Sequence, residues 1–424
     1  MNKNESKNPM NTLFVGIDVG SDKNIVHMKN FNNKKLEHFE FINDKIGIEI
    51  LKDRTLDVLK KHTELKYIDF VLESTSVYAV HTATFLSTEP NLLKYNPSVY
   101  CINPKVSANF RLSYINRNKN DNIDADLLSE IARIGFLKNT KPWRGTQYLS
   151  LQRLTRHRRH LANMIIREKN YILSNIFLKF SGIITACNND SPFSDLYGTT
   201  SLSVLEEFLS CEEIINASIE DLVIYLNEKS KNKFINPEET AKKLKQAASN
   251  SYRLDKVNLE PINLAISSSI NVIRTYQSEI LSIDKGIKNA VKGINDSAYN
   301  ILLSIPGIGP TIAAGILAEI GSIDNFKDDS ALAKFAGLTW TENQSSNFKQ
   351  EETSLTKTGS SYLRYYIVEA ADKIRKYDPI YSNYYQKKKD ESKTHKEARA
   401  RVLTARKLVK LIYALLSSNQ LYKH

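Results

Sequence analysis

An alternation of strand and helix signals over residues 12–136 is the feature that most constrains how this chain can fold. Short apolar runs predict five strands, at residues 13–18, 24–28, 35–41, 68–73 and 99–102. Asn43 is the expected cap of an amphipathic helix that reaches about residue 59, and a second helix is expected over residues 77–86. Strands that alternate with helices in this order predict an α/β domain over residues 12–140.

Acidic residues stand where these elements end or begin: Asp18, Glu73, Asp121 and Asp124. Asp18 closes the first strand and Glu73 the fourth, while Asp121 and Asp124 fall in the first turn of a later predicted helix. Residues three apart share one helix face, so both of the later carboxylates can reach one ion. Four carboxylates in one place repel each other unless a metal neutralises them, and oxygen-only ligands favour Mg²⁺, with Mn²⁺ as the alternative. The pattern indicates a metal site suited to phosphoryl transfer.

The charge of the chain indicates a polyanionic partner. The net charge is +12, from 59 basic and 47 acidic residues. Residues 141–180 hold nine Lys or Arg against the single Glu168, and residues 346–424 hold seventeen against eight acids. Nucleic acid is the first partner to expect of such basic surface. The alternative interpretation is that an AT-rich genome enriches Lys and Asn throughout.

Other features predict a soluble protein in a reducing compartment. Three cysteines, Cys101, Cys187 and Cys211, have neither metal-ligand spacing nor the pattern of a disulfide framework. The first ten residues are polar and do not resemble a signal peptide. The uncharged run 297–318 is long enough to span a bilayer, but Pro306 and Pro310 interrupt it at its centre. We therefore expect a cytoplasmic protein that does not contact the membrane.

Two long helices are expected over residues 147–296. The first is basic and covers residues 148–183, and the second covers about 262–294. In the second, isoleucine recurs every seven residues, at Ile266, Ile273, Ile280, Ile287 and Ile294, which is a coiled-coil pattern. Contact between subunits is the favoured interpretation, and folding back onto the first long helix is the alternative. Between the two long helices, residues 184–255 are predicted to form a small helical insert, with a loop at 230–236.

A compact helical domain is expected over residues 297–418. The segment 302–309, followed by a helix at 311–319, has the form of a helix-hairpin-helix. Gly307 and Gly309 allow close backbone approach, and the free N–H groups of the following helix suit a DNA phosphate. A plain tight turn between packed helices is the alternative. The chain ends in a predicted basic amphipathic helix, Lys396–Leu416, which is expected to bury Val402, Leu408, Val409 and Ile412.

These residues resemble a known family. The segments Gly16-Ile17-Asp18, Leu72-Glu73-Ser74-Thr75, Ile102-Asn103-Pro104 and 118–125 resemble the N-terminal half of DEDD-type transposases of the insertion sequence 110 family, which includes the Piv DNA invertases. Segments 304–309, 335–339 and 357–364 resemble the C-terminal transposase domain of that family. The resemblance implies an RNase H-like (RuvC-like) N-terminal domain, and the strand order above is that of this fold.

The resemblance also implies a site and partners. The four acidic family positions fall on Asp18, Glu73, Asp121 and Asp124, and the nucleophilic serine falls on Ser345, with Ser346 as the alternative. The implied partners are donor and target DNA, a structured noncoding guide RNA, and further copies of the chain as a dimer or tetramer. Residues expected to contact nucleic acid are Arg153, Arg156, Arg158, Arg159, Arg167, Gly307, Gly309, Lys357 and Arg364. Tyr362, Tyr365 and Tyr366 are further positions at which RNA could stack.

Other interpretations use the same residues differently. A metal-dependent, junction-resolving nuclease would hydrolyse DNA with water and would not need Ser345. A non-catalytic nucleic-acid-binding remnant is a second alternative, although all four carboxylates are intact. An actin-like sugar kinase, suggested by Gly16-Ile17-Asp18-Val19-Gly20, would need a second phosphate loop that the sequence does not show.

Overall fold

The computed structural model describes residues 7–74, 77–112, 121–137, 141–143, 145–186, 190–294, 296–340, 344–345, 348–349 and 354–423. The chain divides into two compact units, unit 1 (Met1–Leu149) and unit 2 (Ser150–His424). Unit 1 contains a five-stranded sheet, and the described part of unit 2 is helical apart from a two-stranded hairpin and an isolated bridge between Trp340 and Leu355. The mixed α/β character expected for the N-terminal region is confirmed.

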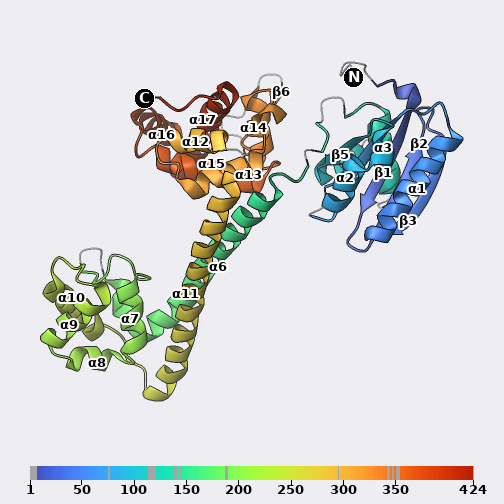
Figure 1. Cartoon of the computed structure of the whole chain (residues 1–424). Coiled ribbons are helices and arrows are strands. Elements are labelled where there is room, and N and C mark those ends of the chain that lie inside the picture. The colour runs from blue at the N-terminus through green and yellow to red at the C-terminus, as the bar shows by residue number, and fades with distance from the viewer. Residues whose placement is uncertain are drawn as a thin grey trace. The chain divides into compact units, whose positions relative to one another are not determined.

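Unit 1 is built on a mixed sheet with the strand order β3-β2-β1-β4-β5 (Figure 1). Its strands are β1 (Thr12–Val19), β2 (Lys23–Lys29), β3 (Lys35–Ile42), β4 (Tyr67–Glu73) and β5 (Ser98–Ile102). The first three strands pair antiparallel, whereas β4 lies parallel to β1 and β5 lies parallel to β4. All five predicted strands are present.

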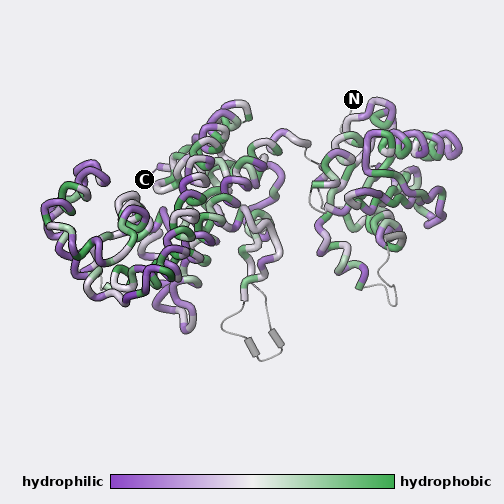
Figure 2. Tube along the Cα trace, turned by 90° about the horizontal axis from the view of Figure 1, so that it is seen from below, coloured by the Kyte–Doolittle hydropathy of each residue, from purple (hydrophilic) through white to green (hydrophobic). Residues whose placement is uncertain are grey.

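The two faces of the sheet bury different cores. Leu13, Val15 and Ile17 of β1 belong to a large core shared with α1 and α2, whereas Phe14 belongs to a smaller core shared with α5. Successive strand residues point to opposite faces, so Gly16 and Asp18 lie on the same face as Phe14. Hydrophobic and hydrophilic positions are interspersed along the trace of unit 1 (Figure 2), as expected where each element buries one side.

The helices of unit 1 are α1 (Lys45–Lys61), α2 (Ala79–Thr88), α3 (Pro90–Leu93), α4 (Pro104–Leu112) and α5 (Asp121–Arg133), and a short 3₁₀ turn (Pro9–Asn11) precedes β1. The expected cap of α1 is wrong by one residue. The side chain of Asp44, not Asn43, accepts a hydrogen bond from the N–H of Gly47 at 2.7 Å. Asn43 instead donates its side-chain amide to the carbonyl of Gly20 at 2.9 Å, which ties the turn after β1 to the start of the helix.

Two long helices form the centre of unit 2: α6 (Leu149–Thr185) and α11 (Lys256–Lys292). They run side by side in opposite directions (Figure 1). At one end Arg158 of α6 pairs with Asp284 of α11 at 2.6 Å, and at the other end isoleucines of both helices share one core. Ile266, Ile273 and Ile287 of the heptad series are buried within the chain. The structure therefore shows α11 folded back along α6 within the chain, and contact between subunits stays a prediction.

The insert between the long helices consists of α7 (Thr199–Glu207), α8 (Cys211–Asn216), α9 (Ile219–Ser230) and α10 (Pro237–Ser249). Its helices pack on a core that includes Phe180, Ile266 and Ile270 of the long helices, so the insert is joined to α6 and α11 by buried apolar contact. The loop predicted at residues 230–236 is confirmed, because α9 ends at Ser230 and α10 begins at Pro237.

The C-terminal part of unit 2 contains α12 (Asp296–Ser304), α13 (Pro310–Ile320), a 3₁₀ turn (Ile323–Asn325), α14 (Asp329–Ala336), α15 (Ser361–Ile374), α16 (Pro379–Glu391) and α17 (Lys396–Ser418), with the hairpin strands β6 (Gln344–Ser345) and β7 (Phe348–Lys349). The predicted last helix is confirmed as α17, and it buries Leu408, Val409 and Ile412, although Val402 is only partly buried. The uncharged run 297–318 forms α12 and most of α13 with a turn between them, and no described helix is long and apolar enough to cross a membrane.

Candidate active site

Two of the predicted carboxylates lie at the ends of neighbouring parallel strands. Asp18 is the penultimate residue of β1, and Glu73 is the last residue of β4. The register of the two strands pairs Ile17 with Leu72, which places Asp18 and Glu73 at the same level of the sheet. Val71 belongs to the α5 core, so Glu73, two residues later, faces α5 as Asp18 does. Strand geometry therefore brings both carboxylates to one edge and one face.

A glycine brings the third carboxylate to that face. α5 packs on β1, and a Cβ atom at Gly16 would overlap the carbonyl oxygen of Ala125 and the amide nitrogen of Ser129. The helix can approach the strand this closely only because residue 16 has no side chain. Asp124 immediately precedes Ala125 at this contact and is 7% exposed. Asp121 is the first residue of α5, three positions before Asp124, and its side chain lies outside the described residues.

Helix α4 contacts two of the carboxylates from one of its faces. The hydroxyl of Ser107 donates to Oε2 of Glu73 at 2.7 Å, and Ser107 itself is 2% exposed. One turn later, the guanidinium of Arg111 forms an ion pair with the carboxylate of Asp124. Residues four apart share a helix face, which explains how α4 reaches both acids. The sequence analysis did not identify either residue, because nothing local marks a Ser and an Arg as partners of distant acids.

The donor set fits a hard divalent cation. Asp18, Glu73 and Asp124 supply only carboxylate oxygens, as Mg²⁺ and Mn²⁺ prefer. The Nε of Arg111 is buried and has no hydrogen-bond partner among the described residues, so the guanidinium is satisfied only in part beside these acids. Asp18, Glu73 and Asp124 do not by themselves form a group close enough to hold a metal, and no such group of three or more His, Cys, Asp or Glu occurs among the described side chains, which omit that of Asp121.

A neighbouring acid on α5, Asp126, pairs with residues of β2 and not with the other carboxylates. Asp126 pairs with Lys29 of β2 at 2.6 Å, and its Oδ1 lies 3.5 Å from Nδ1 of His27. Burial, reinforced by the neighbouring His38, lowers the pKa of His27 to about 4 against the opposing effect of Asp126. Asp126 thus points away from Asp124, as its spacing of two residues predicts.

The basic cluster of α6 is largely engaged inside unit 2. Arg156 forms a bidentate pair with Glu319 at 2.8 and 3.0 Å, and Glu319 has only 1% of its side chain exposed. Arg158 pairs with Asp284, and Arg159 lies over the ring of Tyr365 at 4.1 Å. Figure 1 shows α15, which carries Tyr365, beside the N-terminal end of α6.

Arg153 and Arg167 on the same helix are exposed and are the members of the cluster most open to a partner.

The predicted helix-hairpin-helix positions differ in accessibility. Gly307 has a φ of +82°, and a Cβ there would lie 3.0 Å from Lys373, so this turn is pressed against α15. Gly309 caps α13 without a side chain, and a Cβ there would meet nothing within 4 Å. Lys357 is exposed, whereas Arg364 donates to the carbonyl of Ala336 at 3.1 Å, and burial together with Arg159 lowers its pKa.

The predicted serine lies in the short hairpin of unit 2. β6 and β7 pair antiparallel, with Ser345 opposite Phe348. The side chain of Ser345 and all of Ser346 lie outside the described residues. The structure thus places the backbone of Ser345 and leaves the choice between the two serines to experiment.

Comparison with known proteins gives two family matches. A family model of DEDD transposases of the IS110 type matches residues 15–180, and a model described as the IS116/IS110/IS902 transposase family matches residues 299–386. The chain is 21% identical over 97% of its length to an uncharacterized 44.8 kDa protein of insertion element IS116 from Streptomyces clavuligerus, covering 96% of that protein. It is 28% identical to an uncharacterized 43.6 kDa protein of insertion element IS110 from Streptomyces coelicolor, over 29% of this chain and 30% of that protein.

Proposed function

Because the chain belongs to the IS116/IS110/IS902 family of transposases, we propose that this DNA transposase cuts and rejoins DNA through Ser345, with its carboxylate cluster holding Mg²⁺. The observation that supports the proposal is the position of Asp18 and Glu73 at the ends of neighbouring strands, on the face of the sheet against which α5, with Asp121 and Asp124 in its first turns, packs. A purely structural sheet gains nothing from gathering acids in this way, since they repel each other.

We propose that unit 1 has an RNase H-like, RuvC-like fold. Three antiparallel strands followed by two parallel ones, in the order β3-β2-β1-β4-β5, support this assignment, as does the position of the acids on β1, β4 and a late helix. In this reading the sheet acts as a rigid support that fixes the separation of Asp18 and Glu73, because their strands are hydrogen-bonded neighbours.

Asp18, Glu73, Asp121 and Asp124 would hold the metal. A bound Mg²⁺ would polarise the scissile phosphate and stabilise the leaving oxygen. The protein contributes the preorganisation: the hydrogen bond from Ser107 orients the Glu73 carboxylate, and the backbone contact at Gly16 holds α5 against the strand. Preorganised groups of this kind need little reorganisation when charge develops in the transition state.

Ser345 would act as the nucleophile. Its Oγ forms a bond to the phosphorus of a DNA phosphodiester and loses its proton, while the bond from phosphorus to one deoxyribose oxygen breaks and that oxygen leaves as a hydroxyl. The phosphoserine link keeps the phosphodiester energy, so a hydroxyl from another strand can later displace the serine. Ser346 stays the alternative nucleophile.

The partners are proposed on the same basis. Donor and target DNA are the substrates, and a structured noncoding RNA encoded by the element would select them by base pairing. Arg153, Arg167 and Lys357 are exposed cations suited to phosphate contacts, and the free N–H groups after Gly309 suit a backbone phosphate. The carboxylates and the serine belong to different units, so we propose that they come together from different subunits of a homo-oligomer.

Magnesium-dependent recombination between donor and target DNA, with RNA from the flanking element, tests the proposal. Wild type is compared with Ser345→Ala and Asp121→Ala, and denaturing gels detect a covalent protein–DNA adduct. Loss of strand exchange in both variants is expected, with an adduct only when Ser345 is present. If cleavage continues in Ser345→Ala and stops in Asp121→Ala, the carboxylates hydrolyse DNA with water and Ser345 is not the nucleophile. An adduct that disappears only in Ser346→Ala would transfer the role to that residue.

A further inference from the structure

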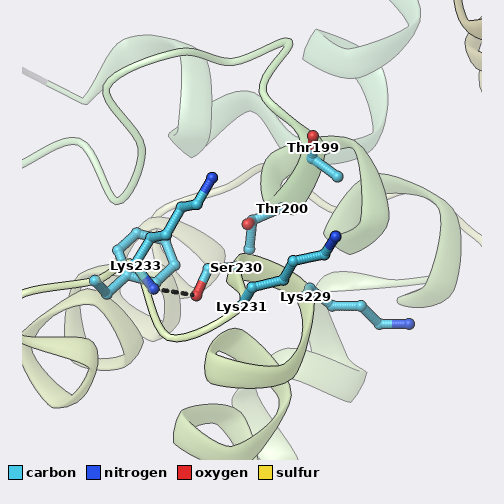
Figure 3. Close-up of a pocket in the computed structure, with 7 residues that line it drawn as sticks. Thr199, Thr200, Lys229, Ser230, Lys231 and Lys233 are labelled. Carbon is cyan, nitrogen blue, oxygen red and sulfur yellow. Dashed lines mark hydrogen bonds between the residues drawn. The ribbon is translucent and has the colours of Figure 1, made fainter.

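The insert contains a basic cavity that the proposed chemistry does not use. It lies between the start of α7 and the loop after α9 and has a volume of about 360 Å³. Its lining residues, here called the insert pocket, are Thr199, Thr200, Lys229, Ser230, Lys231, Lys233 and Phe234. A cavity of this size accommodates a small-molecule-sized group. Figure 3 shows the side chains of Lys231 and Lys233 extending toward the side on which Thr199 and Thr200 lie, while Lys229 points away.

The lysines of the loop are not neutralised by the protein. Lys229 pairs with Glu207 at 2.7 Å, but Lys231 and Lys233 are exposed and form no ion pair with any described residue. The loop is also held in an unusual conformation, because Lys231 and Asn232 both have a φ of 57°. The hydroxyl of Ser230 accepts the backbone N–H of Lys233 at 3.3 Å, which closes the turn (Figure 3). Lys231 is the C-cap of α9, and its N–H returns to the carbonyls of Asn227 and Glu228, so the left-handed turn also ends the helix.

The opposite wall supplies hydrogen-bond donors. α7 begins at Thr199 after Gly198, which has no side chain to cap the helix. The first backbone N–H groups of the helix therefore have no capping acceptor. In the same turn, the hydroxyl of Ser201 is buried, with the residue 1% exposed, and has no hydrogen-bond partner among the described residues. Ser201 is not among the residues that line the pocket, so its unpaired hydroxyl lies beside the cavity and does not contact an occupant of it.

We propose that the insert pocket binds a backbone phosphate of a nucleic acid. Uncapped N–H groups, the positive end of the α7 dipole and two unpaired ammonium groups together match an anion with several acceptor oxygens. The proposal rests on the proposed function: phosphodiester oxygens fit better than a protein carboxylate because the chain is a DNA transposase, and ammonium groups bind phosphate as point charges without reading sequence. The insert thereby becomes a further nucleic-acid contact, in addition to the carboxylate face and the turn before α13.

Equilibrium binding across a series of salt concentrations tests the proposal with the full-length chain. Fluorescently labelled duplex DNA and single-stranded RNA of equal length are titrated with wild type, Lys231→Ala/Lys233→Ala, and the control Lys242→Ala/Lys243→Ala. The control removes the same charge from the same insert, but its lysines are paired with Glu238 and Glu239. Each lost phosphate contact lowers the salt slope by about 0.9 for duplex DNA or about 0.7 for a single strand. A several-fold loss of affinity specific to the pocket variant is expected, and the probe that shows it identifies the source of the phosphate.

Gly198→Asp provides a second variant that does not depend on removing lysines. Aspartate is a favourable N-cap, residue 198 has extended φ and ψ angles of −69° and 156°, and a Cβ there would lie 3.2 Å from the carbonyl oxygen of Asp195, which must shift slightly to accept it. The carboxylate would satisfy the free N–H groups and place negative charge where the phosphate is proposed to sit. Unchanged or raised thermal stability together with weaker nucleic-acid binding is expected. Equal affinities and salt slopes for wild type, both pocket variants and the control would overturn the proposal, whatever the recombination assay shows.

Discussion

At the scale of single residues, the carboxylate face depends on partners that are distant in sequence. Asp18 and Glu73 could be predicted because each ends an apolar run, and a strand end is visible in the sequence. Ser107 and Arg111 could not, because their roles follow from how α4 lies against β4 and α5. The cap of α1 shows the same limit, since Asn43 and Asp44 are both good caps and only the backbone path chooses between them.

The ion pair between Arg111 and Asp124 predicts competition with metal. The guanidinium supplies the positive charge at Asp124, so a divalent cation must displace it to reach that carboxylate. Replacing Arg111 with Gln should therefore tighten Mn²⁺ binding several-fold in isothermal titration, and should lower the melting temperature of the metal-free chain. Lys105→Gln is the matched control, because it removes the same charge from an exposed position of the same helix. Equal or weaker Mn²⁺ binding in Arg111→Gln would contradict the competition, whereas no binding to wild type would contradict the metal site itself.

At the scale of elements, the basic helix α6 shows why a charge pattern alone does not define a surface. The cluster at residues 156–159 predicts nucleic-acid contact, yet Arg156 and Arg158 meet carboxylates far along the chain, at Glu319 and Asp284. The isoleucine heptads of α11 are similar, because periodicity identifies an apolar stripe without identifying what covers it. In the structure one member of that stripe, Ile266, lies in a core shared with residues of α6 and the insert.

Arg156 should accordingly affect stability more than binding. Arg156→Met leaves the buried carboxylate of Glu319 with Ser360, at 3.2 Å, as its one remaining side-chain donor among the described residues. Breaking a buried pair from one side costs about 3 kcal/mol of unfolding free energy, measured by urea denaturation. The double variant Arg156→Met/Glu319→Leu should recover most of that loss, since it leaves no unpaired charge. Arg153→Met, at an exposed position, is the control. Unchanged stability of Arg156→Met combined with weaker DNA binding would assign Arg156 to the nucleic-acid surface after all.

At the scale of the whole molecule, the carboxylates and the serine lie in different compact units. The sequence could predict both halves, because each has its own motifs in the right order. It could not predict which halves work together, since that depends on assembly and not on local pattern. The proposed arrangement takes one half from each of two subunits.

Complementation between inactive variants tests that arrangement. A mixture of Ser345→Ala and Asp121→Ala chains, allowed to exchange subunits, should regain recombination, because a mixed oligomer contains one site with both an intact carboxylate cluster and an intact serine. Each variant alone should stay inactive. Differently tagged chains and a pull-down establish that mixed oligomers form. Mixed oligomers without activity would show that each site is built within a single chain.

The contact at Gly16 also has a consequence for inheritance. Every base change that alters the amino acid encoded by a glycine codon gives a residue with a Cβ atom or a stop codon, and a Cβ at this position overlaps the backbone of α5. No single base change that alters residue 16 therefore gives an amino acid that this contact tolerates. Among duplicated copies of a mobile element, the residue at position 16 should separate copies that can still move from those that have decayed, before any change reaches the acids themselves.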